Sequence, residues 1–432
     1  MTNGVSISRR DFIRRAILIS AGALVPFGHD AWAARAIAGS PRSASERKRL
    51  VVVFLRGAVD GLSVVPPHGD PLYFEARPTI AIPRPRGGSA VVSAGSGDQS
   101  MLDLDGHFGM HPALGSLLPL WRDRKLAFIH ACGSPDPTRS HFEAQDYIET
   151  ATPGVHSTQD GWMNRLLAQL PGNHNATEAV NLGPVVPRIL AGKLAVANIP
   201  TGRGAGRPMP LDRPGIEQAF ARLYQGNDPL STNFRAGEAA RKKLLGEIQE
   251  DMKIADNGAP PPNGFASDAS QLARLIARDP GIRLAFVGLG GWDTHVNQGA
   301  AHGQLAGHLQ PLADGLAGFA KDLGPAWNDT VVVVLSEFGR TVHENGNAGT
   351  DHGHANVMWV MGGGVCGGKV YGEWPGLSNS DLYQGRDLAV TTDFREPLAL
   401  VVRDHLGLND SQLRQVFPGS PATHQRGLDI LT

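Results

Sequence analysis

Cysteine is scarce in this chain of 432 residues, which contains only Cys132 and Cys366. Two cysteines exclude the disulfide framework on which small secreted proteins depend. The lack of a cysteine cluster also argues against a structural zinc knot. Both thiols lie beside predicted core strands, so the sequence is compatible with two buried free thiols and with a single bridge.

No charge of one sign dominates, because Lys+Arg 40 against Asp+Glu 41 leaves a formal net charge of -1. A protein that binds nucleic acid would need a basic stripe, and we therefore expect no nucleic-acid partner. Beyond the N-terminal region, the sequence also lacks an apolar run long enough to cross a membrane. The mature protein is therefore expected to have no membrane span.

Familiar catalytic motifs are missing as well. The segment from His343 to Asn347 lacks the second histidine of the helical HExxH zinc motif, and the chain has no GxSxG nucleophile elbow. The stretch from Gly362 to Gly367 matches GxGxxG after a predicted strand, but no helical pattern follows it. A dinucleotide site needs that helix, so the sequence does not indicate a cofactor of this kind.

The N-terminal region has the layout of an export signal. Arg9 and Arg10 precede an apolar stretch from Ala16 to Phe27, and small residues follow it. The segment 8–14, SRRDFIR, resembles the twin-arginine signal by which bacteria export folded proteins. We expect cleavage after Ala33, the twin-arginine export machinery as a partner, and a periplasmic or secreted mature protein.

Five apolar runs predict core strands, and helical patterns lie between them. The strands are expected at 50–55, 126–131, 282–288, 330–335 and 357–361, and the helices at 112–122, 140–149, 304–323 and 396–406. This alternation predicts an α/β fold with a mainly parallel central sheet. We expect a signal peptide at 1–33 and one α/β domain at 48–432, in which the Pro/Gly-rich range 160–270 forms an insertion or cap.

Polar residues follow each of the first four predicted strands. Ligands of open α/β sheets bind beyond the carboxyl ends of the strands, so these residues are candidates for a site. In chain order they are Arg56, Asp60, His130, Asp136, Arg139, Ser140, His141, Asp293, His295, Glu337, Arg340, Asp351, His352 and His354. Any one of them could be a turn residue, a cap or a core histidine, but four such strand ends in succession indicate a shared site.

Ser140 has two interpretations. Ser140 and Glu143 match a capping box, in which the serine caps a helix and the glutamate reaches back to it. A helix N-terminus also presents backbone N–H donors and a positive dipole, which favour a phosphate or sulfate and an activated hydroxyl. Ser140 is therefore either a cap alone or a cap that also serves as a nucleophile or anion site.

Five segments carry a resemblance to a known family. In order they read FLRGAVDGLSVVPP, RSHFEAQD, GGWDTH, LSEFGRT…ENGNAGTDHGHAN and VTTDFR, behind the twin-arginine signal. Together they resemble the bacterial domain-of-unknown-function family numbered fifteen-oh-one, within the alkaline phosphatase/sulfatase superfamily. The resemblance spans nearly the whole mature chain, and the fourth segment is its most specific part. It implies a three-layer α/β/α sandwich, like that of alkaline phosphatase, with a metal site at the carboxyl edge of the sheet.

The resemblance also implies roles for single residues. Asp60 matches the metal-binding Asp of the superfamily after the first strand, and Ser140 takes the place of its Ser/Thr nucleophile. Asp293 and His295 resemble its later Asp…His metal pair, at a shorter spacing.

One position departs from the superfamily pattern. Glu337 stands where an adjacent Asp-His pair is common, and Phe338 takes the place of the histidine. His352 or His354, from the following loop, could supply the missing imidazole.

The resulting hypothesis is an exported, metal-dependent hydrolase of phosphate or sulfate esters. It needs one or two divalent metal ions (Zn, Mn, Mg or Ca), for which carboxylate oxygens and neutral imidazoles are suitable ligands. The predicted ligands are Asp60, Asp293, His295, Glu337, Asp351, His352 and His354. Ser140 and Arg139 are the predicted catalytic residues, with Arg56 and Arg340 binding an anionic ester substrate. The main alternative is a non-catalytic exported binding or assembly protein that keeps the phosphatase-like fold. A third possibility is a metal-free serine hydrolase that uses Ser140 with a His/Asp pair.

Overall fold

The computed structural model describes residues 47–86, 99–172, 174–183, 185–199, 255–420 and 427–431. The expected signal peptide at 1–33 lies outside these residues, as does about half of the range 160–270, from 200 to 254. Among the described residues, every helix is too short or too polar to cross a membrane.

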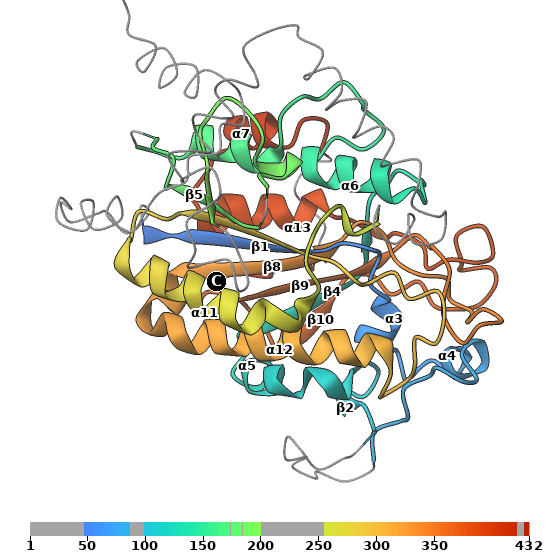
Figure 1. Ribbon diagram of the computed structural model, residues 1–432. Coiled ribbons are helices and arrows are strands. Elements are labelled where there is room, and N and C mark those ends of the chain that lie inside the picture. The colour runs from blue at the N-terminus through green and yellow to red at the C-terminus, as the bar shows by residue number, and fades with distance from the viewer. Residues whose placement is uncertain are drawn as a thin grey trace, which may run out of the picture.

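A nine-stranded sheet runs through the centre of the described part of the chain (Figure 1). Its strands lie in the order β10 (Lys369–Tyr371), β4 (Leu126–Gly133), β9 (Asn356–Gly362), β8 (Thr330–Ser336), β1 (Arg49–Leu55), β7 (Leu284–Leu289), β5 (Ala179–Leu182) and β6 (Ala197–Ile199), and β11 (Thr392–Asp393) pairs with β4. β1 is parallel to both of its neighbours, whereas β9 is antiparallel to β4 and β8. The mainly parallel central sheet predicted from the sequence is confirmed.

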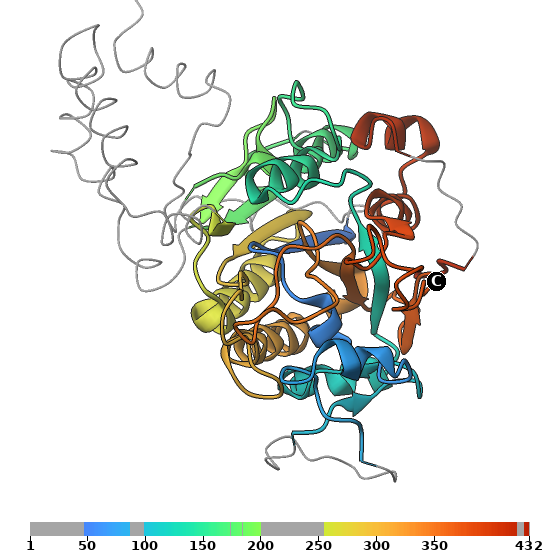
Figure 2. The same ribbon diagram turned by 90° about the vertical axis from the view of Figure 1, so that its right-hand side faces the viewer.

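Helices cover both faces of this sheet, which gives the predicted three layers (Figures 1 and 2). One face carries α5 (Leu118–Arg122), α11 (Phe265–Arg278) and α12 (Gln304–Leu323), and the other carries α6 (His141–Thr150), α7 (Trp162–Gln169) and α13 (Arg395–Leu400). Alternate side chains of β1 point to opposite faces, so Val51 and Val53 join the core under α11 and α12. Leu50 and Val52 join the core under α7 and α13. This two-sided burial explains why β1 is apolar along its length.

Smaller elements surround the sandwich. They are α3 (Gly61–Val64), α4 (Leu72–Ala76), α14 (Asp410–Val416) and the two-stranded sheet of β2 (Leu102–Asp103) and β3 (Gly109–Met110). The helix expected at 112–122 begins as a 3₁₀ segment at Pro112–Leu117 and becomes α-helical only in α5. The helix expected at 396–406 is α13 followed by a π-helical turn at Val401–His405.

The range 160–270 contributes directly to the sandwich. Its described portions supply α7, β5, β6 and the first turns of α11, and β5 pairs with β7 inside the main sheet. The range expected to form an insertion or cap therefore also supplies an edge of the core sheet.

The two cysteines are both free thiols. Cys132 is buried at the end of β4, where burial and the charge of Asp393 raise the pKa of its thiol well above the usual value. Cys366 is partly exposed. The structure therefore contains two unbridged thiols.

Candidate metal centre

Loops at the carboxyl edge of the sheet bring together side chains from three distant parts of the chain. His141 is the first residue of α6, which follows β4. Asp293 and His295 follow β7, and His352 lies in the long connection between β8 and β9. Because β4, β7 and β8 all run in the same direction, their carboxyl ends meet at this edge.

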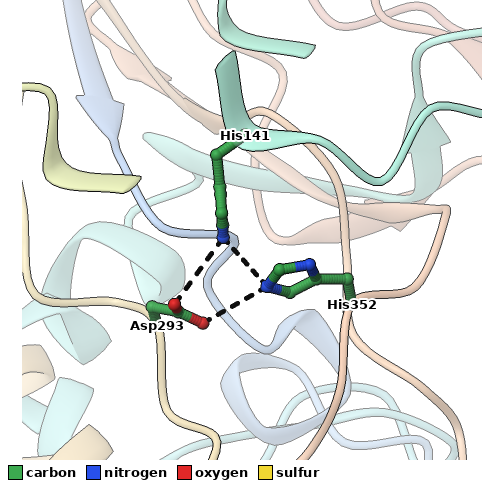
Figure 3. A group of neighbouring side chains, drawn as sticks. All are labelled: His141, Asp293 and His352. Atoms are coloured by element: carbon green, nitrogen blue, oxygen red, sulfur yellow. Dashed lines mark hydrogen bonds and ion pairs between the residues drawn. The ribbon is translucent and has the colours of Figure 1, made fainter. Parts of the chain in front are cut away.

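Two imidazoles and one carboxylate converge there, those of His141, His352 and Asp293 (Figure 3), and the imidazole of His295 contacts the last two. The Nε2 atom of His352 lies 2.9 Å from Nε2 of His141 and 3.0 Å from Nε2 of His295. The carboxylate oxygens of Asp293 lie 3.7 Å from Nε2 of His141, 3.0 Å from that of His295 and 3.5 Å from that of His352. We refer to His141, Asp293, His295 and His352 as the His/Asp cluster.

The other nitrogen of each imidazole has a fixed acceptor. The three contacts are Nδ1 of His141 to Oε1 of Glu337 at 2.7 Å, Nδ1 of His295 to Oδ1 of Asp351 at 3.2 Å, and Nδ1 of His352 to the carbonyl oxygen of Arg139 at 3.1 Å. Each acceptor favours the tautomer with its proton on Nδ1. All three Nε2 lone pairs are then directed into the cluster, which is the arrangement in which histidines bind metals.

Glu337 is completely buried beneath the cluster. Its carboxylate accepts hydrogen bonds from the backbone N–H of Gly57, the side chain of Gln145 and the hydroxyl of Ser336. Burial alone would raise the pKa of Glu337, but the hydrogen bond and charge of His141 outweigh it and lower the pKa to about 2. Glu337 is therefore an ionised support for His141 and not a member of the cluster itself.

Gly57 allows this close packing. Its φ of 112° is one that side chains rarely permit, and a Cβ atom there would lie 2.8 Å from the backbone nitrogen of Asp293. The glycine after β1 thus lets the loop that carries Asp293 approach the sheet edge.

Asp293 is held by an arginine on its other side. The Arg340 guanidinium donates to Oδ1 of Asp293 at 2.6 Å and to the backbone carbonyls of Ala58 and Gly57. Burial acts to raise the pKa of Asp293, but the three histidines and Arg340 outweigh it and keep the pKa well below its usual range. The carboxylate is therefore available as an anionic ligand.

These residues fit a divalent metal ion. Four ligands about 2.0–2.1 Å from a tetrahedral zinc ion would lie about 3.3 Å from one another. The contacts among His141, Asp293 and His352, and those of His295 with Asp293 and His352, range from 2.9 to 3.7 Å and bracket that value. The group whose ligand atoms all lie within 4.8 Å of one another consists of His141, Asp293 and His352. Three neutral imidazoles and a carboxylate also match the ligand preference of zinc better than that of magnesium or calcium.

Asp60, the predicted ligand after the first strand, forms an ion pair with Arg77 and is not part of the His/Asp cluster. It is fully buried, and both of its oxygens accept from the guanidinium of Arg77, with Ser63 and Gln298 completing its hydrogen bonds. Burial acts to raise the pKa of Asp60, but Arg77 outweighs it and lowers the pKa. An arginine thus supplies the positive charge that the sequence interpretation assigned to a metal.

The capping box predicted at Ser140 does not form. Ser140 is the N-cap residue of α6, but its side chain makes no capping hydrogen bond. Glu143 accepts from the hydroxyl of Thr138 instead. The Ser140 side chain is exposed and directly precedes His141, so the capping explanation for this serine is removed.

Two predicted substrate-binding arginines are turned away from solvent. Arg56 is buried and donates to Glu149 at 2.7 Å and to Gln145. Arg340 is buried behind Asp293. Neither can clamp a substrate from these positions. Arg139 is partly exposed and pairs with Asp387 at 2.6 Å.

His352 and His354, the two candidates for the missing imidazole, have different surroundings. His352 belongs to the cluster, whereas Nε2 of His354 contacts the carbonyl oxygen of Ser134 at 3.1 Å, and its ring lies against Tyr383. Phe338 is buried, with its ring centre 4.9 Å from that of His141 and 5.2 Å from that of His352. The phenylalanine in the position of an expected ligand therefore packs against two cluster histidines.

His141 is the main residue that the sequence interpretation missed. It is one of the polar residues after the second strand, but the capping pattern assigns the functional role to its neighbour Ser140. A histidine at the first position of a helix that begins at the ligand edge was the available signal. Asp256 was also missed: Oδ1 accepts from the backbone N–H of Gly291 at 2.6 Å, and burial raises its pKa to about 6.

Comparison with known proteins gives a family and several remote likenesses. The family model described as "Protein of unknown function (DUF1501)" matches residues 47–417. No curated protein has a matching sequence.

Among solved structures, similarity extends to the lipoteichoic acid synthase LtaP from Listeria monocytogenes, with 12% identity, 88% of this chain and 78% of that chain covered, and a TM-score of 0.34. A protein in the alkaline phosphatase superfamily from Vibrio parahaemolyticus is 9% identical, with 85% and 72% covered and a TM-score of 0.36. The C-terminal periplasmic domain of EcEptC from Escherichia coli, in complex with Zn, is 12% identical, with 73% and 72% covered and a TM-score of 0.33. Likenesses this remote assign no activity to the chain.

Proposed function

We propose that this chain, which belongs to the DUF1501 family of proteins of unknown function, is an exported, metal-dependent hydrolase of phosphate or sulfate esters. The observation that supports it most is the convergence of the His141 and His352 imidazoles on the Asp293 carboxylate, with His295 in contact with Asp293 and His352 and an acceptor behind each imidazole. Histidines that serve packing alone do not need an acceptor at Nδ1 that orients each Nε2 atom toward a shared carboxylate.

The metal would be held by His141, Asp293, His295 and His352. Bound there, a divalent ion would supply Lewis-acid polarisation of an ester oxygen and would favour an ionised nucleophile beside it. Glu337 and Asp351 keep two of the imidazoles oriented, and Arg340 keeps Asp293 in place. We propose a single ion, because Arg77 already neutralises Asp60.

Ser140 is the proposed nucleophile. Its side chain is exposed, makes no capping hydrogen bond, and directly precedes the ligand His141. In the first step, a bond forms between Oγ of Ser140 and the phosphorus or sulfur atom while the bond to the alcohol oxygen breaks. The hydroxyl proton passes to the departing alcohol, and water then cleaves the enzyme ester to release phosphate or sulfate and regenerate the serine.

Export is part of the proposal. The twin-arginine motif at Arg9 and Arg10 supports delivery of the folded protein to the periplasm or beyond. Replacement of both arginines by lysine should leave the protein in the cytoplasm with its leader uncleaved. Normal export of that variant would refute the twin-arginine route.

The test of the hydrolase proposal combines metal analysis with turnover. Folded protein should contain about one equivalent of a divalent metal and should hydrolyse an aryl phosphate or an aryl sulfate. Removal of the metal by a chelator should abolish turnover, and its return should restore it. Metal-free protein that ignores both ester classes would refute the proposal. Bound metal without turnover would favour the alternative, a binding or assembly protein that retains the fold.

A further inference from the structure

Two arginines share one buried carboxylate beside the His/Asp cluster. Asp387 is fully buried, and its Oδ2 accepts from Nε and Nη2 of Arg139 at 3.1 and 2.6 Å. Its Oδ1 accepts from Nε of Arg386 at 2.9 Å. The side chains of Arg139 and Arg386 remain 30% and 45% exposed, respectively, so each guanidinium also faces solvent. We refer to Arg139, Arg386 and Asp387 as the arginine pair and its carboxylate.

Both arginines contact the same cluster histidine. The backbone carbonyl of Arg139 lies 3.1 Å from Nδ1 of His352, and Nη2 of Arg386 donates to the carbonyl oxygen of His352 at 2.6 Å. Arg139 also directly precedes Ser140 in the sequence. The arginine pair therefore borders the cluster at His352.

The charges of this group do not cancel. Two guanidinium ions face one carboxylate, which leaves one positive charge at a partly exposed position. Asp387, Gln384 and the carbonyl oxygen of His352 hold the Nε and Nη2 atoms of the two arginines. An incoming anion would therefore meet the Nη1 donors of guanidinium groups that are already oriented. Guanidinium groups suit planar, bidentate recognition of phosphate and carboxylate oxygens.

We propose that Arg386, together with Arg139, binds the anionic group of the substrate and makes the centre select doubly charged phosphate monoesters over singly charged sulfate esters. This inference rests on the proposed function and narrows its substrate class. A phosphate monoester carries close to two negative charges at about pH 8, whereas a sulfate ester carries one. The extra positive charge next to His352 therefore favours the phosphate.

The structural alternative is that the pair only fastens the loop around Asp387 to the loop that carries His352. The two explanations differ in what Arg386→Gln changes. A fastening role affects the His352 loop and hence metal retention, whereas an anion-binding role affects the ligand and leaves the metal in place.

The experiment measures binding of two non-hydrolysable anions to the full, metal-loaded protein by calorimetry at about pH 8. Phenylphosphonate and benzenesulfonate carry the same aryl group but differ in charge. Wild-type protein should prefer phenylphosphonate by about tenfold, and Arg386→Gln should lose most of that preference with unchanged metal content, since a hydrogen bond to a charged group has about this effect. Arg403→Gln is the matched control, because Arg403 also pairs with the aspartate that follows it but makes no contact with the cluster histidines.

Three outcomes would overturn the inference: no preference in the wild type, an Arg386→Gln protein that keeps the preference, or one that loses metal. If Arg386→Gln does not fold, Arg386→Lys is measured in its place, because lysine retains the positive charge but lacks the planar set of guanidinium N–H donors. It should bind phenylphosphonate more weakly than the wild type, and an unchanged affinity would overturn the inference. Turnover of phenyl phosphate and phenyl sulfate by the wild type separates the two proposals. Selective binding of phenylphosphonate without hydrolysis of either ester refutes only the hydrolase function. Hydrolysis without a preference for phenylphosphonate refutes only the role of Arg386.

Discussion

The Nε2 atoms of His141 and His352 lie 2.9 Å apart, and the Nδ1 atom of each ring has an acceptor of its own. With both protons on Nδ1, two lone pairs would face each other at this distance. Either a proton or a metal ion between the rings removes that repulsion. The protonation of this histidine pair is therefore coupled to metal binding.

The two histidines of the DHGH segment should differ in their effect on metal binding. His352→Ala should weaken metal affinity by more than about a hundredfold, because the loss of an outer support alone costs about 10- to 100-fold. His354→Ala should retain the metal and lower only the free energy of unfolding, since His354 contacts Ser134 and Tyr383 instead of the cluster. Metal content and chelator competition measure both variants. If His354→Ala loses the metal and His352→Ala retains it, the ligand is His354 and not His352.

Glu337 should act through His141. Glu337→Gln keeps the size of the side chain but removes the anionic acceptor of Nδ1, and metal affinity should fall by about 10- to 100-fold. Glu344→Gln is the matched control: Glu344 lies in the same loop, accepts from Thr79 and Ile80, and should leave affinity unchanged. Competition with a chelator of known affinity measures the difference, and equal affinities in the two variants would contradict the assignment.

The stability of metal-free protein should fall as pH rises, whereas His141 should give no such pH dependence to metal-loaded protein. Burial acts to lower the pKa of His141, but Asp293 and Glu337 outweigh it and raise the pKa from its ordinary 6.5 to about 9. In metal-free protein this contribution to stability is complete below about pH 6.5 and is lost as pH rises through 9. Metal binding displaces the proton, so the metal affinity should instead rise with pH across the same range, by up to about tenfold per unit.

Urea unfolding with and without a chelator, between about pH 6.5 and 9, measures this difference. The stabilisation by metal should increase with pH because ligand binding to the folded state adds directly to stability. Parallel pH profiles for the two forms would show that His141 does not exchange its proton for the metal.

The sequence predicted the sheet better than it predicted its edges. β1 and β8 are continuous apolar runs buried on both faces, and α12 has a clear helical period with the predicted bounds. β5 has only four residues and β6 only three, in a Pro/Gly-rich stretch, and so short a segment carries no periodic signal. The strands that set the core could therefore be predicted, and the added strands beside β7 could not.

The candidate site shows the same division. That polar residues gather after β7 and β8 follows from the sequence, because parallel strands end at one edge. Which partner each side chain reaches does not follow, since Arg77 comes from a separate turn and competes with any metal for Asp60. The choice between His352 and His354 likewise depends on the path of one loop, which spacing alone does not determine.

Asp60 should be a stability residue. Asp60→Asn leaves the Arg77 guanidinium buried without its counter-charge, and loss of one partner of such a pair costs about 3–5 kcal/mol. Metal content should not change. Asp329→Asn is the control, because Asp329 forms partly exposed ion pairs with Arg47 and Lys48, and such pairs contribute about 0–1 kcal/mol. Urea unfolding and metal analysis test both statements, and loss of metal from folded Asp60→Asn would restore Asp60 as a ligand.

Ser140→Ala should lower turnover without changing stability or metal content. Because the Ser140 side chain makes no capping hydrogen bond, the variant should unfold within about 0.5 kcal/mol of the wild type, whereas the loss of a functional cap would cost about 1 kcal/mol. Its metal content should also be unchanged, since Ser140 is not in the cluster. Turnover of an aryl phosphate should nevertheless fall by about a thousandfold or more if its Oγ is the nucleophile. Ser157→Ala, at another exposed serine, controls for the substitution itself. Full turnover by Ser140→Ala would show that the nucleophile is water and not Ser140. A variant that is destabilised but still active would show that Ser140 caps the helix.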